Sequence, residues 1–402
     1  MTNDSPTLNA LLEHLQQFTS QSAINSSLLA IQEDANNHEQ INSLCRALIN
    51  EGQRHNQSAW AAHMTSSPTA ASILGQVLAG LHNGNLLSPQ LYPLLDKIEQ
   101  QLISWFCQLY RHQYGHFTAG ATYANLEALW QAREHASHDS KLVYGSHASH
   151  FSVAKACQVL GLTFQEIDTD QYDRILPSAL AEVCQQQVPI AVVLTAGTSA
   201  CGEIDPLSEC IQICQAFDCW SHVDAAWGAG LVLLEQYQPL FCAVADADSL
   251  TIDPHKAFSQ PKPCGLLLYQ RPLQPLFAID ANYLEHPPKQ TLPGSFGGEL
   301  FLPLWSSLMF SGVADLRKQM QHRLQQAQCF AEFLTSQPYW WHHQSPTGII
   351  CFRPSADINL DDLVTLGLFS KAKVNNKTVY RCVFASQAAQ ATSLITALEP
   401  FC

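Results

Sequence analysis

The chain has 402 residues, of which 47% are hydrophobic and 13% charged, and its formal net charge is -14. This composition excludes an intrinsically disordered protein and predicts a large buried core, in one large domain with a smaller companion or in two to three units. The negative charge, with no cluster of lysines and arginines to offset it, argues against nucleic acid or an anionic membrane as a partner.

The N-terminal segment, residues 1–68, is predicted to be mainly helical. The runs "LNALLEHLQQF" and "INSLCRALINEG" place apolar residues at steps of three and four, but too few of them for the segment to fold alone. The chain starts without a basic leader and a continuous apolar stretch, and no later segment is long and apolar enough to span a bilayer. We therefore expect a soluble, cytoplasmic protein.

Residues 69–312 are predicted to form a large α/β domain. Two helical stretches, "AASILGQVLAGLHNG" and "LYPLLDKIEQQLISWFCQLY", lead into it, and from about residue 117 short apolar runs alternate with helical patterns. The candidate strands are 141–145, 162–167, 190–197, 219–226, 248–253 and 265–269, and the helical segments between the first four are 151–160, 176–187 and 206–217. Such alternation predicts βαβ crossovers and a mainly parallel, buried sheet.

Residues 313–402 are predicted to form a small α+β domain. A segment rich in proline and glycine, 271–298, interrupts the alternating pattern before this domain. The long helix "VADLRKQMQHRLQQAQCFAEFL" then leads to two strand–helix units around "GIICFRP" and "VYRCVFAS".

The fourteen cysteines are predicted to be reduced and buried, because they are scattered through apolar segments of a chain with no export signal. Cys210, Cys214 and Cys219 form the densest group. Cys210 and Cys214 fall one helical turn apart, but no second close pair completes a tetrahedral zinc site. The sequence therefore predicts core packing for these thiols and no bound metal.

Polar residues follow three of the predicted strands, and in a parallel sheet ligands bind beyond the carboxyl ends of the strands. Asp224 closes "SHVD", Lys256 follows "TIDPH", and "TAGTSACGEIDP" follows the strand that ends near Leu194. By themselves, the carboxylate and the amine are also compatible with a buried ion pair.

A small turn that contains glycine, residues 119–122, opens the amphipathic segment "FTAGATYANLEALWQAR". Free backbone amides and the positive end of a helix dipole make such a turn a seat for a phosphate, although an ordinary capped helix has the same pattern. The phosphate seat, the carboxylate and the strand-end lysine together match the needs of pyridoxal phosphate. The lysine bonds to its aldehyde, the carboxylate keeps the pyridine nitrogen protonated, and the helix terminus holds the phosphate.

Three longer motifs resemble the group II pyridoxal-phosphate-dependent amino-acid decarboxylases: "HVDAAWGAG" at 222–230, "ADSLTIDPHKAFSQPKPCGLLLY" at 247–269 and "LTAGTSACGEIDPL" at 194–207. This family includes the glutamate, aromatic amino-acid, cysteine sulfinate and 2,4-diaminobutyrate enzymes. The likeness runs from about His63 to the C-terminus. It implies a fold-type I, aspartate aminotransferase-like architecture and a homodimer with a shared active site, across which the helical N-terminal segment packs.

The resemblance also implies the cofactor residues. Lys256 matches the lysine that bonds to the cofactor, Asp224 the partner of the pyridine nitrogen, and His150, in "SHASHFSVAKA", the histidine that stacks on the ring. A histidine taken alone is more often a core residue. The other implied cofactor-binding positions are Ala121 and Thr122 at the phosphate, Thr198, Asp205 and Ala226 beside the ring, and His255 next to the lysine.

Two further positions are candidates on the substrate side. Arg381, in "VYRCVFAS", matches a C-terminal arginine that helps hold the substrate carboxylate or shape the site in some members, and a plain surface arginine is the alternative. Thr69, in "SSPTAAS", is a candidate pocket residue.

The segment after the lysine departs from the family. Members usually carry a long mobile loop with a tyrosine that supplies a proton to Cα, whereas here residues 280–299 are short and Tyr283 stands outside the family context. The proton would then come from another donor, such as His286 or a residue of the partner chain, or protonation would be inefficient and side reactions would be favoured.

The predicted activity is the decarboxylation of an L-amino acid to an amine and carbon dioxide. The open substrates are 2,4-diaminobutyrate, glutamate, aspartate, cysteine sulfinate and aromatic amino acids, and "HKAFSQP" is closer to the diaminobutyrate-type enzymes than to the aromatic ones. One alternative is a carbon–carbon lyase or aldehyde-forming enzyme on the same cofactor fold. Another is a protein that has lost catalysis and serves in binding or assembly, which the short loop favours and the intact Lys256, Asp224 and His150 argue against.

Overall fold

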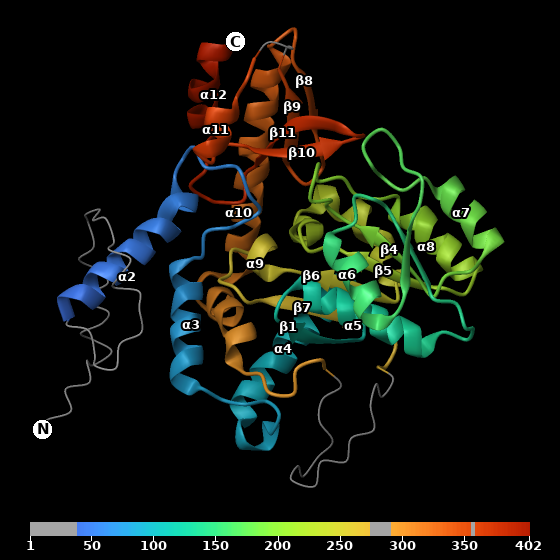
Figure 1. Ribbon diagram of the computed structural model, residues 1–402. Helices are drawn as coiled ribbons and strands as arrows, with labels where there is room; N and C mark the ends of the chain where they lie inside the picture. Colours follow the sequence, from blue (N-terminus) through green and yellow to red (C-terminus); the bar gives the residue numbers. More distant parts are fainter. Residues whose placement is uncertain (1–37, 274–290, 355–357) are drawn as a thin grey trace, which may run out of the picture. The chain divides into compact units, whose positions relative to one another are not determined.

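The computed structural model describes residues 38–273, 291–354 and 358–402 (Figure 1). The chain divides into two compact units, residues 1–57 and 58–402. In the described part of the first unit, helix α2 (His38–Gly52) is followed by the short 3-10 helix η2 (Gln53–Asn56). The helix predicted from "INSLCRALINEG" is confirmed, whereas "LNALLEHLQQF" lies outside the described residues.

The second unit is built around a seven-stranded sheet with the order β1-β7-β6-β5-β4-β2-β3. Strands β2 to β6 pair in parallel, and β7 runs antiparallel to both β1 and β6. The strands are β1 (Tyr114–Thr118), β2 (Leu142–Gly145), β3 (Thr163–Glu166), β4 (Ala191–Thr195), β5 (Trp220–Asp224), β6 (Ser249–Ile252) and β7 (Gly265–Tyr269). All six predicted strands and the mainly parallel sheet are confirmed. β1 is an additional edge strand, in which Gly115 and His116 interrupt the apolar pattern.

Helices cover both faces of this sheet (Figure 1). Val143 and Val193 pack with α5 and α6, whereas Tyr144, Val192 and neighbouring strand residues pack with α4, α7 and α8. The helices are α3 (Ala70–His82), α4 (Pro93–Tyr110), α5 (Ala121–His135), α6 (Phe151–Leu160), α7 (Pro177–Gln186), α8 (Leu207–Ala216) and α9 (Pro254–Ala257). Successive strand residues therefore enter two different cores, because side chains alternate between the faces of a strand. The predicted crossover helices are confirmed.

Short 3-10 helices occupy segments for which no element is predicted. They are η3 (Pro89–Leu91), η4 (Gly228–Leu233), η5 (Glu235–Asp246), η6 (Gly298–Leu300) and η7 (Glu399–Phe401). η4 and η5 follow β5 directly, so the chain turns away from the sheet immediately after Asp224.

The long helix α10 (Leu302–Thr335) begins before the predicted helix at 313 and contains a break at Gly312, with φ 71° and ψ 172°. Its first part packs tightly on α3, since a Cβ on Gly75 would lie 2.4 Å from the carbonyl oxygen of Leu302. The predicted domain boundary at 312/313 falls at this break. The division into 1–68, 69–312 and 313–402 stays a prediction.

The C-terminal part forms a second, antiparallel sheet with the order β10-β11-β9-β8. Its elements are β8 (Trp341–Gln344), β9 (Ile349–Arg353), α11 (Asp361–Thr365), β10 (Ser370–Val374), β11 (Lys377–Val383) and α12 (Ala391–Leu398). Phe330 of α10 packs with Phe352 and Phe369 in a separate core cluster. The predicted small α+β domain is confirmed, and β8 and β10 are additional strands in it.

All fourteen cysteines are free thiols, and ten of them are buried, including Cys210, Cys214 and Cys219. Burial raises the pKa of Cys107 to about 11 and that of Cys157 to about 12, so these thiols are protonated at neutral pH. Within 38–273, 291–354 and 358–402, every helix is too short or too polar to cross a bilayer.

Candidate active site

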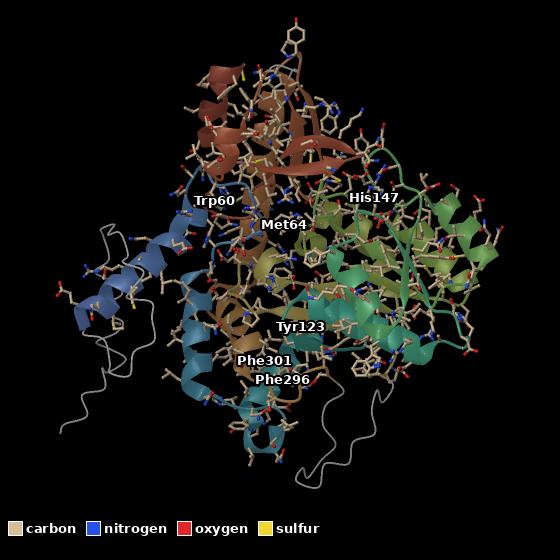
Figure 2. All side chains as sticks on the ribbon, viewed as in Figure 1. Trp60, Met64, Tyr123, His147, Phe296 and Phe301 are labelled. Atoms are coloured by element: carbon tan, nitrogen blue, oxygen red, sulfur yellow. The ribbon has the colours of Figure 1, made fainter. Side chains whose placement is uncertain are left out.

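The carboxyl ends of three neighbouring strands meet at one edge of the large sheet. Thr195 of β4 pairs with Asp224 of β5, which pairs with Thr251 of β6, and Lys256 follows β6 on the short helix α9. A pocket with an open volume of ≈ 320 Å³ lies at this edge. It is lined by Met64, Ala121, His150, Thr195, Gly197, Ser199, Asp224, Ala226, Trp227 and Lys256. Figure 2 labels Met64, which comes from the segment that precedes α3.

The pocket brings together five residues that the sequence predicts for the site. These are Ala121, His150, Asp224, Ala226 and Lys256. Thr122, Thr198, Asp205, His255, Thr69 and Arg381 are not among its lining residues. The structure places the amine of Lys256, the carboxylate of Asp224 and the imidazole of His150 in a single pocket. The proposed chemistry of all eleven residues stays a prediction.

Asp224 is almost fully buried, with 4% of its surface exposed. Its Oδ2 accepts a hydrogen bond from Asn125 Nδ2 at 2.8 Å, and its Oδ1 accepts one from the backbone N–H of Ala226 at 3.0 Å. A buried carboxylate is stabilised only when such donors replace its water. Asn125, on α5, is a site residue that the sequence analysis does not identify.

Lys256 forms an ion pair with a second buried carboxylate. Its Nζ lies 2.9 Å from Oδ2 of Asp253, and the lysine side chain is 22% exposed while that of Asp253 is 2% exposed. His255, between them in sequence, points its Nδ1 at the carbonyl oxygen of Cys264, 2.7 Å away, and burial lowers its pKa. Asp253 is not predicted as a site residue, although its place at the end of β6 is the same signal that identified Asp224.

The predicted phosphate seat is the N-terminus of α5. Gly120 precedes the helix with φ 122°, a conformation that favours glycine, and the N–H of Ala121 donates to Asp253 Oδ1 at 2.7 Å. No side chain caps this helix. A phosphate at this terminus would therefore compete with Asp253 for the first amide.

The shape of this terminus depends on Gly265 of β7. A Cβ on Gly265 would lie 2.5 Å from Cα of Gly120 and 2.6 Å from Oγ1 of Thr118. We expect Gly265→Ala to lower the free energy of unfolding by roughly 1–3 kcal/mol and to weaken cofactor binding, because backbone must move to admit the methyl group. Urea unfolding and a cofactor titration measure the two effects.

Gly80→Ala is the matched control, because a Cβ at this exposed position of α3 meets nothing within 4 Å. Replacing a glycine inside a helix with alanine stabilises by about 0.5–1 kcal/mol. Equal effects of the two substitutions would contradict the close approach of Gly265 to Gly120.

The donors and acceptors of the pocket fit pyridoxal phosphate. The hydroxyl of Thr195 is buried without a hydrogen-bond partner, and it lines the pocket beside the amine of Lys256 and the carboxylate of Asp224. The indole nitrogen of Trp227 is also buried and unpaired. Unpaired buried polar atoms are costly, so their presence in this pocket indicates a polar ligand.

Two of the remaining predicted residues, Thr198 and Asp205, bond to backbone groups near the end of β4. Thr198 Oγ1 accepts from the backbone N–H of Glu203 at 3.2 Å, and the carboxylate of Asp205 accepts from those of Thr195 and Ile175 at 2.6 and 2.8 Å. Burial raises the pKa of Asp205 to about 6. The structure thus places Thr198 and Asp205 where they hold the β4 end of the site.

Arg381 and Thr69 also bond to protein groups. The guanidinium of Arg381 donates to the carbonyl oxygens of Ser199 and Ala62 and, at 3.0 Å, to Oγ of Ser370. Thr69 caps α3, where its Oγ1 accepts from the N–H of Ser72 at 3.1 Å. Arg381 is therefore no plain surface residue. It joins Ser199, which lines the pocket, to Ala62, which stands two residues before the lining residue Met64.

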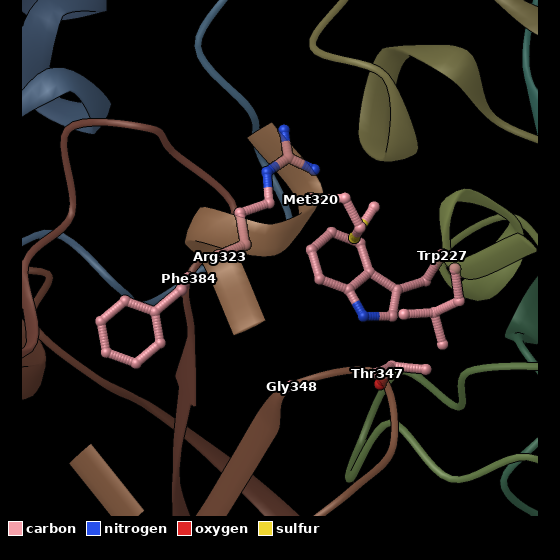
Figure 3. A pocket seen from close by; sticks show the side chains of 7 residues that line it. Trp227, Met320, Arg323, Thr347, Gly348 and Phe384 are labelled. Carbon is pink, nitrogen blue, oxygen red and sulfur yellow. The ribbon is translucent and has the colours of Figure 1, made fainter. Parts of the chain in front are cut away.

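A second pocket of ≈ 330 Å³ adjoins the first, since Trp227 lines both. Figure 3 shows Trp227 there with Met320 and Arg323 of α10. Arg323 is 5% exposed and donates to the carbonyl oxygens of Lys256 and Ala257, each at 3.2 Å. Burial lowers its pKa to about 10. Arg323 thus supports the turn that carries Lys256, a role that the helical pattern of α10 does not indicate.

Two buried histidines predict sensitivity to acid. Burial lowers the pKa values of His222 and His112 to about 4, below the ordinary value of 6.5. Between these values the unfolded chain binds more protons than the folded one, so stability is complete above pH 6.5 and is lost as the pH falls towards 4. We expect a loss of up to about 3 kcal/mol per histidine, at 1.36 kcal/mol for each pKa unit.

Asp205 acts in the opposite direction, because its raised pKa of about 6 favours the folded state as the pH falls towards 3.8. With two histidines against one aspartate, urea unfolding at pH 7 and pH 5 should show lower stability at pH 5. His112→Gln should reduce the difference between the two pH values. If the free energy of unfolding were the same at pH 7 and pH 5, both for the wild type and for His112→Gln, the assignment of neutral buried histidines would be contradicted.

Comparison with known proteins identifies relatives of this chain. The family model for the pyridoxal-dependent decarboxylase conserved domain matches residues 22–354. An aromatic-L-amino-acid decarboxylase of Bacillus atrophaeus is 31% identical over 64% of this chain and 59% of its own length. An L-2,4-diaminobutyrate decarboxylase of Rhizobium meliloti is 33% identical over 52% of this chain and 44% of its own length. The chain thus spans about half the length of these two relatives.

A solved structure shares the whole architecture. Tryptophan decarboxylase of Catharanthus roseus, in complex with L-tryptophan, superposes with a TM-score of 0.82 at 19% sequence identity, covering 98% of this chain and 96% of the other. The predicted fold-type I architecture is therefore confirmed, as is the predicted family resemblance. With a family model that matches most of its length, the chain belongs to the pyridoxal-dependent decarboxylase family.

Proposed function

We propose that this protein uses pyridoxal phosphate to decarboxylate an L-amino acid to the corresponding amine and carbon dioxide. The observation that carries the proposal is the shared pocket of Lys256, Asp224 and His150 at the N-terminus of α5. These groups supply an amine for the cofactor aldehyde, a carboxylate for the pyridine nitrogen and an aromatic surface for the ring.

The bound cofactor would supply an electron sink for the negative charge left on Cα when carbon dioxide departs. Lys256 would bond to the cofactor aldehyde and, once displaced by the substrate amine, would move protons near Cα. Asp224 would hold a proton on the pyridine nitrogen, and His150 would contact the ring. Ala121 and Thr122, at the start of α5, would bind the phosphate through backbone N–H groups.

The remaining predicted residues have supporting roles in this proposal. Thr198 and Asp205 would hold the end of β4, Ala226 would line the ring site, and His255 would fix the lysine turn through its bond to Cys264. Arg381 would shape the pocket rather than hold the substrate carboxylate, since all three of its guanidinium nitrogens donate to protein oxygens. Thr69 stays proposed as a residue of the substrate pocket.

The proton donor to Cα is proposed to be Lys256 or a group of the partner chain. Tyr283 and His286, the two candidates in the segment after the lysine, lie outside the described residues. The substrate stays open among 2,4-diaminobutyrate, glutamate, aspartate, cysteine sulfinate and aromatic amino acids.

A panel of these amino acids tests the proposal, with products analysed by mass spectrometry and carbon dioxide measured in parallel. Amine and carbon dioxide in equal amounts from at least one substrate would support it. An aldehyde in place of the amine would instead favour the aldehyde-forming alternative. Cofactor binding without turnover of any substrate would favour the binding or assembly protein.

We also propose that the protein acts as a cytoplasmic homodimer with a shared active site. Ten buried free thiols suit a reducing compartment. Leu74, Leu78 and Leu81 lie on one face of α3 at steps of four and three, and they are 41%, 36% and 62% exposed. Met309 and Phe310, on the part of α10 that packs against α3, are 66% and 69% exposed. An apolar surface of this kind favours association with a second copy.

Introducing charge on this surface should separate the proposed dimer. We expect Leu74→Glu combined with Leu81→Glu to shift the sedimentation coefficient from that of a dimer to that of a monomer, because buried carboxylates without partners are strongly unfavourable. Leu366→Glu, at a position 64% exposed after α11, is the control and should leave the dimer intact. A monomeric wild type, or a double variant that stays dimeric, would contradict the proposed interface.

A further inference from the structure

A continuous chain of buried hydrogen bonds ends on Asp224. The indole Nε1 of Trp220 lies 2.8 Å from Oγ of Ser249, which lies 2.8 Å from Nδ1 of His222. Nε2 of His222 lies 3.0 Å from Oδ1 of Asn125, whose Nδ2 lies 2.8 Å from Oδ2 of Asp224. All five residues are at most 6% exposed, so water cannot replace these bonds.

The two ends of this chain fix the direction of every bond in it. An indole N–H can only donate, and a carboxylate can only accept. Asn125 Nδ2 therefore donates to Asp224, and Asn125 Oδ1, which can only accept, takes its hydrogen bond from an N–H at Nε2 of His222. A neutral imidazole has one donor and one acceptor, so Nδ1 of His222 accepts from the hydroxyl of Ser249, which in turn accepts from the indole N–H of Trp220. The amide group of Asn125 then faces Asp224 with its nitrogen.

A branch of the chain reaches His150. The second N–H of Asn125 Nδ2 points to Oγ of Ser152, 3.0 Å away. Oγ and the backbone nitrogen of Ser152 lie 2.8 and 3.3 Å from Nδ1 of His150. Because a backbone N–H can only donate, Nδ1 of His150 accepts, and the ring of neutral His150 holds its proton on Nε2.

We propose that Asn125 is a positioning residue that couples Asp224 to His150, and that His222 fixes the orientation of Asn125. One amide group donates to both branches, so the carboxylate is held as an acceptor and the imidazole is held in its Nε2–H form by the same side chain. The consequence for the reaction rests on the proposed function: Asp224 keeps acceptor positions for a protonated ring nitrogen, and His150 presents a neutral ring.

A purely structural network predicts a different response to substitution. If Asn125 only fills space and satisfies buried groups, then every substitution of it lowers stability and weakens cofactor binding to the same extent at every pH. If direction matters, a group that donates only when protonated should restore function only at low pH. Asn125→Asp and Asn125→Leu, both close to asparagine in size, separate the two cases.

The expected result is a pH-dependent recovery in Asn125→Asp alone. At pH 8 both variants should bind pyridoxal phosphate about tenfold more weakly than the wild type, or worse, because a donor to a carboxylate is lost. Two carboxyl groups at hydrogen-bond distance cannot both stay ionised, so the new carboxyl group takes up a proton as the pH falls and then donates to Asp224. At pH 6 the ratio to wild type should therefore improve for Asn125→Asp and not for Asn125→Leu.

The charged and titratable groups that face this cluster are Asp224 and His222 of β5, His150 before α6, and Lys256 with Asp253 around α9. They are common to all variants, so each affinity is compared with the wild type at the same pH. Asn83→Asp, at an exposed position after α3, controls for the added charge and should bind as the wild type does. The proposal would be overturned if Asn125→Asp and Asn125→Leu had the same cofactor affinity relative to wild type at pH 8 and at pH 6. It would also be overturned if either variant bound the cofactor as tightly as the wild type at pH 8.

A second measurement reads the network without the cofactor. In protein labelled with [15N]histidine, long-range nitrogen–proton spectra at pH 7 should show His222 and His150 as neutral Nε2–H tautomers, with assignments from His222→Gln and His150→Gln. An Nδ1–H tautomer at either residue would overturn the proposal even if a variant of Asn125 fails to fold. These tautomers do not depend on catalysis. If the protein turned over no amino acid, the proposed function would be contradicted, but the tautomers would still test the hydrogen-bond network.

Discussion

Lys256→Ala is expected to abolish turnover, with a loss on the order of 10³-fold or more in kcat, because the residue both bonds to the cofactor and moves protons in the proposed reaction. The absorption band of lysine-linked cofactor should disappear as well. The structure supports a specific effect, since the Lys256 side chain lies in the pocket and pairs there with Asp253 at 2.9 Å. Steady-state kinetics with the best substrate of the panel, together with an absorption spectrum, would measure both losses.

Lys262→Ala is the matched control for this result. Lys262 lies six residues further along the same loop, is exposed and does not line the pocket. It should keep the spectrum and most of the activity of the wild type. Residual activity above about a tenth in Lys256→Ala, or an equal loss in Lys262→Ala, would remove Lys256 from the proposed mechanism.

Asp224→Asn is expected to lower kcat by about 10²–10⁴-fold, the range that a positioned proton-transfer group contributes. The substitution keeps the size of the side chain but leaves one acceptor oxygen where Asp224 has two, one for the N–H of Asn125 and one for that of Ala226. It removes the negative charge that would keep the pyridine nitrogen protonated. Affinity for the cofactor should therefore change much less than kcat, and the two are measured separately by titration and by steady-state kinetics.

Asp246→Asn removes a negative charge from an exposed position at the end of η5 and serves as the control. Its kcat should match the wild type within about twofold, because exposed charges contribute little. If Asp224→Asn kept a kcat close to the wild-type value, the negative charge of Asp224 would have no catalytic role, and the side chain would serve only in the buried hydrogen-bond network.

Most of the large sheet is predictable from the sequence because its inner strands are short, fully buried and almost wholly apolar. β4, "AVVLT", and β7, "GLLLY", are buried at every position. The strands that are not predicted from the sequence lie at the edges of the two sheets and are more polar. β8, "WHHQ", is half exposed, and β1 begins with exposed Tyr114, so neither has an apolar run that marks a strand.

The pocket residues that follow strand ends are predictable for a topological reason. Parallel strands bring their carboxyl ends to one edge, so Asp224 and Lys256 meet although they are far apart in the sequence. The residues that support Asp224 and Lys256 cannot be predicted in this way. Asn125 contacts His222 across 97 positions, and Arg323 contacts Lys256 across 67. Each fits an ordinary helical pattern, and only the packing of α5 and α10 reveals its partners.

Two residues of the site, Asp253 and His222, could have been predicted from their positions in the sequence. Asp253 closes β6 in the same way that Asp224 closes β5, and His222 stands two residues before Asp224, on the same face of the strand. A rule that examines every polar residue within two positions of a strand end would identify both. Arg381 and Asp205 were identified by resemblance, and their contacts indicate support of the pocket walls.

Reduction of the protein with borohydride in the presence of pyridoxal phosphate, followed by peptide mapping, identifies the amine that bonds to the cofactor. Reduction makes the bond between the cofactor and an amine permanent, so the labelled residue can be identified by mass spectrometry. We predict one labelled peptide, which spans 251–261 and carries the added mass on Lys256. A label on another lysine, or no label at all with saturating cofactor, would show that Lys256 does not bond to the cofactor.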